Sequence, residues 1–121
     1  MRVLLVEHES DEAQRMAQGL NEASYSVDVA ANGMAAQRLV EDGEYDLVIL
    51  DVMLPGLNAW KLQQAIRQKG DTPQLFLTTP GGIEDRLRGL ELHEDDYLLK
   101  PFEAKALVAR VRSVLRRDRG R

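Results

Sequence analysis

The sequence lacks cysteine and has no long hydrophobic run. The absence of cysteine excludes a disulfide scaffold, a thiolate zinc site and a cysteine nucleophile. The longest unbroken apolar runs, residues 3–6 and 47–50, are much shorter than the roughly 20 residues that cross a bilayer. The apolar stretch at the start is also too short for a signal peptide. We therefore expect no membrane association and a cytoplasmic location.

Aromatic residues are scarce, and several catalytic motifs are missing. Only 5% of the residues are aromatic, which argues against a platform that stacks nucleic-acid bases. The sequence contains neither a P-loop nor a Gly-x-Ser-x-Gly nucleophile elbow. These absences argue against a P-loop nucleotide-binding protein and against a hydrolase with a serine nucleophile of that type.

The charges that are present are divided unevenly along the chain. The 121 residues carry 16 Lys and Arg against 20 Asp and Glu, for a formal net charge of −4. Residues 110–121 hold six of the arginines and a single aspartate, so the part before them is strongly acidic. An acidic body argues against nucleic-acid binding by the whole domain. The length is that of one domain with its own core.

Short apolar runs alternate with stretches of helical period five times. The runs with strand character are residues 3–6, 27–30, 47–50, 75–77 and 97–99. After each run, apolar residues recur at helical spacing, and Asn32 has the type and position of a helix N-cap. This alternation predicts an α/β fold with an open parallel sheet covered on both faces, because five units are too few for a closed eight-stranded barrel. Ligands of such doubly wound sheets bind at the carboxyl ends of the strands.

Polar residues follow four of the predicted strands at that edge. They are Glu7, His8 and Glu9 after the first, Asp51 after the third, Thr78 and Thr79 after the fourth, and Lys100 after the fifth. Each of them alone is typical of an ordinary turn or strand end. Together they offer a nucleophilic carboxylate, acids for a divalent cation, a hydroxyl and an ammonium group. A carboxylate attacks an anionic phosphoryl donor only where cations neutralise the charge, so this set predicts phosphoryl transfer onto Asp51.

The segments that carry these residues resemble a known family. Four of them, Val-Leu-Leu-Val-Glu (3–7), Asp-Val-Met-Leu-Pro-Gly (51–56), Leu-Thr (77–78) and Asp-Asp-Tyr-Leu-Leu-Lys-Pro-Phe (95–102), resemble the receiver domain of bacterial response regulators of the OmpR/PhoB type. The likeness covers the whole chain, in order and at the family's spacing. It implies a flavodoxin-like (βα)5 sandwich with a parallel sheet of order 2-1-3-4-5. It also implies a cis peptide bond between Lys100 and Pro101.

The resemblance assigns roles to the residues at the strand ends. It implies that a sensor histidine kinase phosphorylates Asp51, with Lys100 as the counter-charge. Thr78 and Tyr97 are the implied switch pair that reports the phosphoryl group. The chain is then no enzyme, apart from slow self-phosphorylation and dephosphorylation at Asp51. The implied ligands of Mg²⁺ are Glu7, Asp51 and the carbonyl of Met53.

One residue of this pocket departs from the family pattern. His8 stands where the family places its main metal-binding aspartate. Mg²⁺ requires oxygen ligands in near-octahedral geometry, so an imidazole is expected to weaken Mg²⁺ binding. In an alternative arrangement His8 points to solvent, and Glu9 or a water molecule supplies the missing oxygen. Thr79 is a second departure, because the family prefers Ala or Gly there and the larger side chain narrows access for a donor.

Two hypotheses about function follow from His8. In the first, Asp51 still accepts a phosphoryl group, slowly and with weakened or altered metal dependence. In the second, the domain is a phosphorylation-independent pseudo-receiver, a constitutive dimerisation or interaction module in which a protonated His8 stands in for the cation. The first hypothesis is favoured because the chain keeps Asp51, Thr78, Tyr97 and Lys100.

The resemblance also implies a homodimer. Receivers of this type pair through their fourth helix, fifth strand and fifth helix, which include residues 83–90, 97–99 and 104–115 here. Ala106 occupies the place of an acidic residue that pairs with Arg86 across such a dimer, so one ion pair is missing. The matching positions are Arg86, Leu87, Leu90, Glu91, Asp95, Asp96, Ala109, Arg110 and Arg112.

The basic end of the chain has a role in the same family. Residues 1–115 are expected to form the receiver domain, and residues 116–121 a linker toward a winged-helix DNA-binding domain that these residues do not include. Any contact with DNA is then made by that downstream domain. The alternative is a stand-alone receiver that regulates a protein partner.

Overall fold

The sheet has five parallel strands, as the sequence predicts. A computed structural model of the chain describes residues 1–54, 59–81 and 97–119. Neighbouring strands pair in the order β2-β1-β3-β4-β5, all of them parallel. This order confirms the doubly wound, flavodoxin-like fold. The strands are β1 (Arg2–Val6), β2 (Ser26–Ala30), β3 (Leu47–Asp51), β4 (Gln74–Thr78) and β5 (Tyr97–Leu99).

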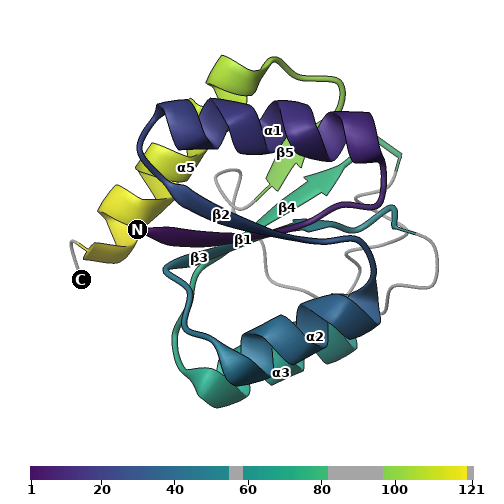
Figure 1. Cartoon of the computed structure of the whole chain (residues 1–121), viewed down its shortest axis with the longest axis vertical. Coiled ribbons are helices and arrows are strands. Elements are labelled where there is room, and N and C mark those ends of the chain that lie inside the picture. Colours follow the sequence, from purple (N-terminus) through teal and green to yellow (C-terminus); the bar gives the residue numbers. More distant parts are fainter. Residues whose placement is uncertain (55–58, 82–96, 120–121) are drawn as a thin grey trace.

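The described helices cover both faces of the sheet, as a parallel sheet requires. They are α1 (Ser10–Glu22), α2 (Gly33–Asp42), α3 (Ala59–Lys69) and α5 (Ala104–Arg119). Figure 1 shows α1 and α5 over one face and α2 and α3 over the other. The helix predicted around residues 83–90 lies outside the described residues. Among the helices that the structure describes, none has both the length and the apolar character needed to cross a membrane.

Two apolar layers, one on each face of the sheet, hold these elements together. Consecutive strand residues point to opposite faces, so Leu4 and Leu50 pack on the side of α2 and α3. Leu5 and Ile49 pack on the side of α1 and α5. All four side chains are fully buried, and burial of each stabilises the fold by roughly 1.5–3 kcal/mol. The continuous apolar runs of β1 and β3 therefore reflect strands with no solvent-facing side.

At the carboxyl edge of the sheet, side-chain caps mark where helices α1 and α2 begin and so where the preceding loops end. Asn32 accepts a hydrogen bond from the Ala35 N–H at 2.8 Å and caps α2, as predicted. Glu9 has the corresponding role for α1, where its carboxylate accepts from the Asp11 N–H at 3.0 Å. Because α1 begins directly after this cap, residues 7–9 form a short loop at the end of β1.

The last helix packs closely on the first. A Cβ atom at Gly19 of α1 would lie 3.0 Å from the Cβ of Ala104, so glycine permits this close approach of α1 and α5. The peptide bond between Lys100 and Pro101, just before α5, is cis, as the resemblance implies. Residues 116–119 continue α5, so the segment expected as a linker begins with helical backbone.

Candidate functional site

The carboxyl ends of three strands bring three charged residues together. The parallel register of β1 and β3 makes Glu7, which follows β1, a neighbour of Asp51 at the end of β3. Lys100 follows β5, and its N–H donates to the carbonyl of Thr78 on β4 at 2.7 Å. The topology of the sheet therefore brings residues from distant parts of the chain together in one cluster.

Lys100 bridges the two carboxylates. Its Nζ lies 2.9 Å from Asp51 Oδ2 and 3.0 Å from Glu7 Oε2. Both distances are typical of charge-assisted hydrogen bonds. The cluster holds two carboxylates and one ammonium group, so a negative charge remains and the pocket attracts cations.

Both carboxylates are almost completely buried. Glu7 and Asp51 are each 1% exposed, whereas the Lys100 side chain is 25% exposed. Burial raises the pKa of Glu7 above its ordinary value and Asp51 adds to the rise, while the hydrogen bonds from Lys100 and from the Glu9 N–H oppose it. Burial by itself lowers the pKa of Lys100, but the hydrogen bonds to Asp51 and Glu7 outweigh it and raise that pKa. Lys100 is therefore a firmly charged partner for the two acids.

Backbone N–H groups fix the orientation of the same carboxylates. The Met53 N–H donates to Asp51 Oδ1 at 2.9 Å, and the Glu9 N–H donates to Glu7 Oε1 at 3.2 Å. With Lys100 on the other oxygen, each carboxylate has a donor on both of its oxygens. Rotation of either group would break these hydrogen bonds, so the carboxylates are held in one orientation.

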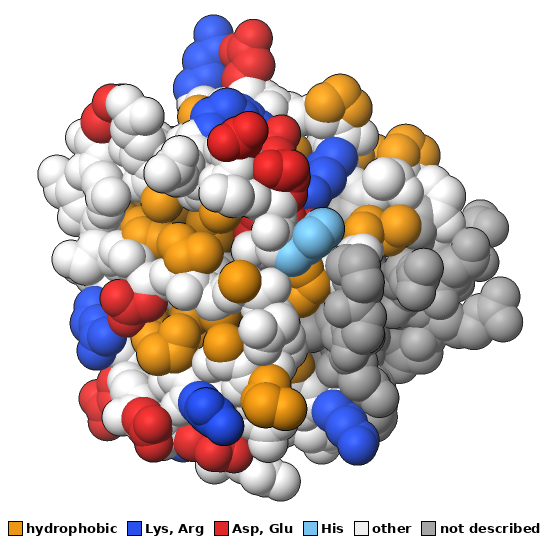
Figure 2. Space-filling view, turned by 45° about the vertical axis from the view of Figure 1, so that its right-hand side comes forward, with side chains coloured by type: hydrophobic (Ala, Val, Ile, Leu, Met, Phe, Trp, Pro, Cys, Tyr) orange, Lys and Arg blue, Asp and Glu red, His pale blue; other side chains and the backbone are white. Residues whose placement is uncertain are grey.

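His8 lies beside the two acids. Its side chain is 50% exposed, and its Nδ1 lies 3.5 Å from Glu7 Oε1. Figure 2 shows a histidine side chain at the surface, close to acidic and basic side chains. The ligand atoms of Glu7, His8 and Asp51 all lie within 4.8 Å of one another. The structure thus brings the imidazole within reach of the carboxylates.

These donors fit poorly with the Mg²⁺ that the resemblance implies. Mg²⁺ prefers an octahedral shell of oxygen atoms. Glu7 and Asp51 offer such oxygens, but the third side chain of the group is an imidazole, which suits transition metals better. Glu9, the alternative oxygen donor, already accepts a hydrogen bond as the cap of α1. Ligation by the carbonyl of Met53 stays a prediction.

The two residues of the implied switch lie on neighbouring strands. Thr78 is fully buried, and its hydroxyl lies 3.3 Å from the Thr79 carbonyl, to which it donates, and 3.8 Å from Met53 Sδ. Tyr97 is partly buried and packs against the apolar layer on the side of α2 and α3. Both side chains are therefore anchored in the sheet, while their role as a switch stays a prediction.

The expected dimer surface is described only in part. Ala109 and Arg112 are exposed on α5 and line a groove between this helix and α1. Arg110 is less exposed, and its Nη1 donates to the carbonyl of Tyr97 at 2.7 Å, which ties α5 to β5 within one chain. The residue types gave no indication of this backbone contact. The expected residues outside the described part are Arg86, Leu87, Leu90, Glu91, Asp95 and Asp96.

A different polar cluster lies at the amino edge of the sheet. Arg2 Nη2 lies 2.7 Å from Asp28 Oδ2, and the Tyr45 hydroxyl donates to the same oxygen at 2.8 Å. The hydrogen bond from Tyr45, followed by that from Arg2, lowers the pKa of Asp28. Burial and the bond to Asp28 raise the pKa of Tyr45 to about 12. No motif in the sequence indicates these three residues, because their types carry no catalytic pattern.

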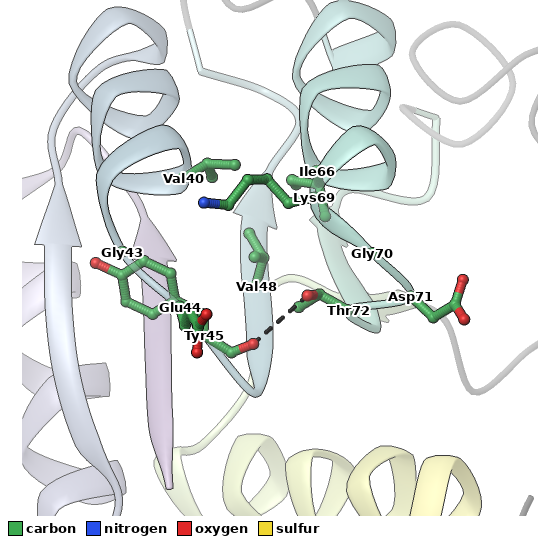
Figure 3. Close-up of a pocket in the computed structure, with 10 residues that line it drawn as sticks. All are labelled: Val40, Gly43, Glu44, Tyr45, Val48, Ile66, Lys69, Gly70, Asp71 and Thr72. Carbon is green, nitrogen blue, oxygen red and sulfur yellow. Dashed lines mark hydrogen bonds between the residues drawn. The ribbon is translucent and has the colours of Figure 1, made fainter.

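Tyr45 also lines a cavity of about 240 Å³ where α2 and α3 end (Figure 3). The close-up shows valine and isoleucine side chains facing this space. Thr72 Oγ1 donates to the Tyr45 carbonyl at 3.5 Å, and Lys69 Nζ donates to the Glu41 carbonyl at 3.0 Å. None of the predicted site residues is among those that line the cavity. Its polar groups join loops and helix ends, and the cluster of Glu7, Asp51 and Lys100 lies at the opposite edge of the sheet.

Comparison with known proteins gives this arrangement a context. The family described as response regulator receiver domain matches residues 3–112. The transcriptional activator protein IrlR of Burkholderia pseudomallei is 46% identical over 121 residues, which cover 100% of this chain and 53% of that protein. The transcriptional regulatory protein CusR of Escherichia coli is 48% identical over 119 residues, which cover 97% of this chain and 52% of that protein. The chain thus spans about half the length of the curated relatives it matches.

A solved structure of similar shape comes from the same class of domain. The non-phosphorylated HemR receiver domain from Leptospira biflexa has a TM-score of 0.80 and 36% sequence identity to this chain. The match covers 94% of this chain and 93% of that one. The similarity therefore extends over nearly the whole fold, including the strands whose carboxyl ends carry the charged cluster.

Proposed function

The chain belongs to the response regulator receiver domain family, of the OmpR/PhoB type, and from this premise we propose that Asp51 accepts a phosphoryl group from a sensor histidine kinase. The observation that carries the proposal is the contact of Lys100 Nζ with Asp51 Oδ2 at 2.9 Å in a buried pocket. A buried carboxylate with a fixed cation beside it is suited to attack an anionic donor, since the cation offsets the charge that accumulates.

In the proposed reaction an oxygen of Asp51 attacks the phosphorus of a phosphohistidine. An oxygen–phosphorus bond forms, the bond from phosphorus to the donor's imidazole nitrogen breaks, and that nitrogen takes a proton from water. Lys100 keeps its charge throughout and pairs with a phosphoryl oxygen. Thr78, whose hydroxyl now donates to the neighbouring Thr79 carbonyl, turns to a phosphoryl oxygen instead, and Tyr97 follows as the second part of the switch.

Hydrolysis returns the domain to its starting state. Water attacks the aspartyl phosphate, the phosphorus–oxygen bond to Asp51 breaks, and inorganic phosphate leaves. The domain is itself the acceptor of the phosphoryl group and loses that group slowly. It therefore acts as a signalling switch and not as a conventional enzyme. Mg²⁺ is expected to assist only weakly, since the third side chain of the ligand group is His8.

The test of this function uses small phosphodonors. The chain is incubated with acetyl phosphate or phosphoramidate, with and without Mg²⁺ and Mn²⁺, and its intact mass is measured over time. We expect one phosphoryl group per chain, which is lost on standing and absent from Asp51→Ala. Asp42→Asn is the matched control, because Asp42 ends α2 and is exposed. No mass increase under any metal would instead favour the phosphorylation-independent pseudo-receiver.

The output of the domain is proposed from its relatives. Relatives named as transcriptional regulators extend well beyond the matched region, since the chain covers 52% or 53% of their length. We therefore place a DNA-binding domain after residues 116–121 and assign DNA contacts to that domain, in a cytoplasmic protein. Reading the coding sequence past Arg121 tests this, and a stop codon there would favour the stand-alone receiver.

Phosphorylation is proposed to act through a homodimer that includes β5 and α5. Arg112 is the residue to change, because it is exposed on α5 whereas Arg110 donates to a backbone carbonyl of its own chain. Sedimentation of Arg112→Glu is expected to show a smaller dimer fraction than the parent, and Arg38→Glu on α2 is the control. An unchanged dimer fraction in Arg112→Glu would contradict this interface.

A further inference from the structure

The side chains of the pocket that could bind a metal ion are of two chemical types. Glu7 and Asp51 contribute carboxylates and His8 contributes an imidazole, with ligand atoms that all lie within 4.8 Å of one another. Imidazole favours transition metals such as Zn²⁺, Ni²⁺ and Cu²⁺, whereas Mg²⁺ is satisfied by oxygen atoms and water. The donor set therefore points to a different class of ion from the one that the family resemblance implies.

The distance between the imidazole of His8 and the carboxylate of Glu7 is suitable for binding of one ion by both side chains. Two ligands that each lie ~2.1 Å from a tetrahedral Zn²⁺ are roughly 3.4 Å apart. The distance from His8 Nδ1 to Glu7 Oε1 is 3.5 Å. Glu7 and His8 therefore need little movement to bind one ion together, and Asp51 completes the group from the neighbouring strand.

The carboxylates of this group are already held in place. The Met53 N–H donates to Asp51 at 2.9 Å and the Glu9 N–H donates to Glu7 at 3.2 Å, as outer hydrogen bonds do around bound metals. His8 differs from them, because its side chain is 50% exposed. A fixed pair of acids and a more accessible imidazole allow an ion to meet His8 first and then the buried oxygens.

Charge also favours an ion at this position. Lys100 is shared by two buried acids and balances the charge of only one of them, so negative charge in the pocket is left uncompensated. A divalent ion at the opposite side of Glu7 contacts Oε1, whereas Lys100 contacts Oε2. The two cations therefore use different oxygens of Glu7 and are compatible.

We propose that Glu7, His8 and Asp51 form a site for a divalent transition ion of the Zn²⁺ type, and that His8 makes this pocket prefer such an ion to Mg²⁺. The inference rests on the proposed function in placing the metal beside the phosphoacceptor. Metal binding is measured on unphosphorylated chain without any donor, so its failure leaves the phosphorylation result unaffected.

The experiment is calorimetric titration of the tag-free chain with Zn²⁺ and, separately, with Mg²⁺. We expect one Zn²⁺ per chain, bound more tightly than Mg²⁺, and a loss of about tenfold or more in Zn²⁺ affinity in His8→Ala. His8→Asp restores an oxygen ligand, so Mg²⁺ affinity is expected to rise about tenfold or more. The matched control is His93→Ala, since His93 is the other histidine of the chain.

Ring signals of the histidines in the parent chain give a second readout that needs no variant. One equivalent of Zn²⁺ is expected to shift the His8 ring signals in an NMR spectrum and to leave those of His93 in place. The proposal is overturned if Mg²⁺ binds the parent more tightly than Zn²⁺. It is equally overturned if His8→Ala keeps the parent's Zn²⁺ affinity, or if His93→Ala is the variant that loses it.

Discussion

The acidic side chains at the two edges of the sheet have opposite surroundings. At the carboxyl edge, Glu7 and Asp51 are each 1% exposed and share one Lys100, and burial raises the pKa of Glu7. At the amino edge, the side chain of Asp28 is 44% exposed and accepts from both Tyr45 and Arg2, which lower its pKa. The first edge holds two buried acids that share one side-chain cation, and the second pairs one partly exposed acid with a cation and a hydroxyl donor.

This difference separates reactivity from stability. Two buried carboxylates that share one side-chain cation raise the free energy of the folded state, and the negative charge that remains favours the binding of a further cation. A partly exposed carboxylate paired with its own cation and a hydroxyl donor stabilises the fold modestly and carries no uncompensated charge. The comparison predicts that changes at the carboxyl edge alter reactivity, whereas changes at the amino edge alter only stability.

The largest effect is expected from Lys100→Met. This change removes the cation between the two buried acids, so the rate of phosphorylation by acetyl phosphate should fall by about 100-fold or more. Intact mass against time gives the rate, and circular dichroism verifies that the variant is folded. Lys105→Met is the control, because the Lys105 side chain is 86% exposed. If Lys100→Met is phosphorylated at a rate close to that of the parent, the prediction that changes at the carboxyl edge alter reactivity is wrong.

The next effect concerns the cost of burying Glu7. Its pKa is raised in the folded state, so its contribution to stability is complete below the ordinary value of 4.5 and is lost as the pH rises through the raised value. Each unit of such a rise corresponds to about 1.4 kcal/mol. Glu7→Gln cannot titrate, so its free energy of unfolding should improve relative to the parent as the pH rises from 4.5 to neutral.

Urea unfolding across that pH range measures this difference. Glu44→Gln, a change at an exposed position near the amino edge, is the control and should track the parent more closely. A Glu7→Gln curve that runs parallel to the parent at all pH values would mean that the carboxyl edge carries no such cost.

A smaller effect is expected at the amino edge from Tyr45→Phe. The change removes the hydrogen bond from the Tyr45 hydroxyl to Asp28 Oδ2, at a cost of about 1 kcal/mol in the free energy of unfolding. The lowered pKa of Asp28 contributes stability above its ordinary value of 3.8 and loses it as the pH falls through the lowered value. The difference between parent and variant should therefore shrink below pH 3.8. Phosphorylation should proceed at the parent's rate, and a slower rate would contradict the separation of the edges.

Much of the fold was predictable from the sequence. The apolar runs of β1 and β3 indicate strands that are buried on both sides, because polar residues are tolerated only where a face meets water. Asn32 was recognisable as a cap from its type and position, and the structure confirms the bond to Ala35. The order of the strands came from the family resemblance, since alternation alone leaves several orders open.

The site was predictable in its members but not in its contacts. Strand ends and the resemblance indicated Asp51, Glu7 and Lys100, yet the sharing of Lys100 by both acids follows from side-chain geometry. The residue type of Glu9 suits a metal ligand, and its use as the cap of α1 depends on where the helix begins. The bond from Arg110 to the carbonyl of Tyr97 was not predictable, because every residue offers a backbone carbonyl.

The amino-edge cluster escaped prediction for a related reason. Arg2, Asp28 and Tyr45 come from three separate segments, and no spacing rule links them. Their contacts arise only when β1, β2 and the segment before β3 are placed side by side. Polar contacts between distant segments depend on the finished fold and leave little signal in the local pattern.

The most direct test of the account measures phosphoryl incorporation at the two edges. The parent, Asp51→Asn and Asp28→Asn are treated with the same phosphodonor and weighed by intact mass spectrometry. The account predicts one phosphoryl group on the parent and on Asp28→Asn, and none on Asp51→Asn. Incorporation into Asp51→Asn at the parent's level, or its absence from the parent, would contradict the claim that Asp51 is the phosphoacceptor.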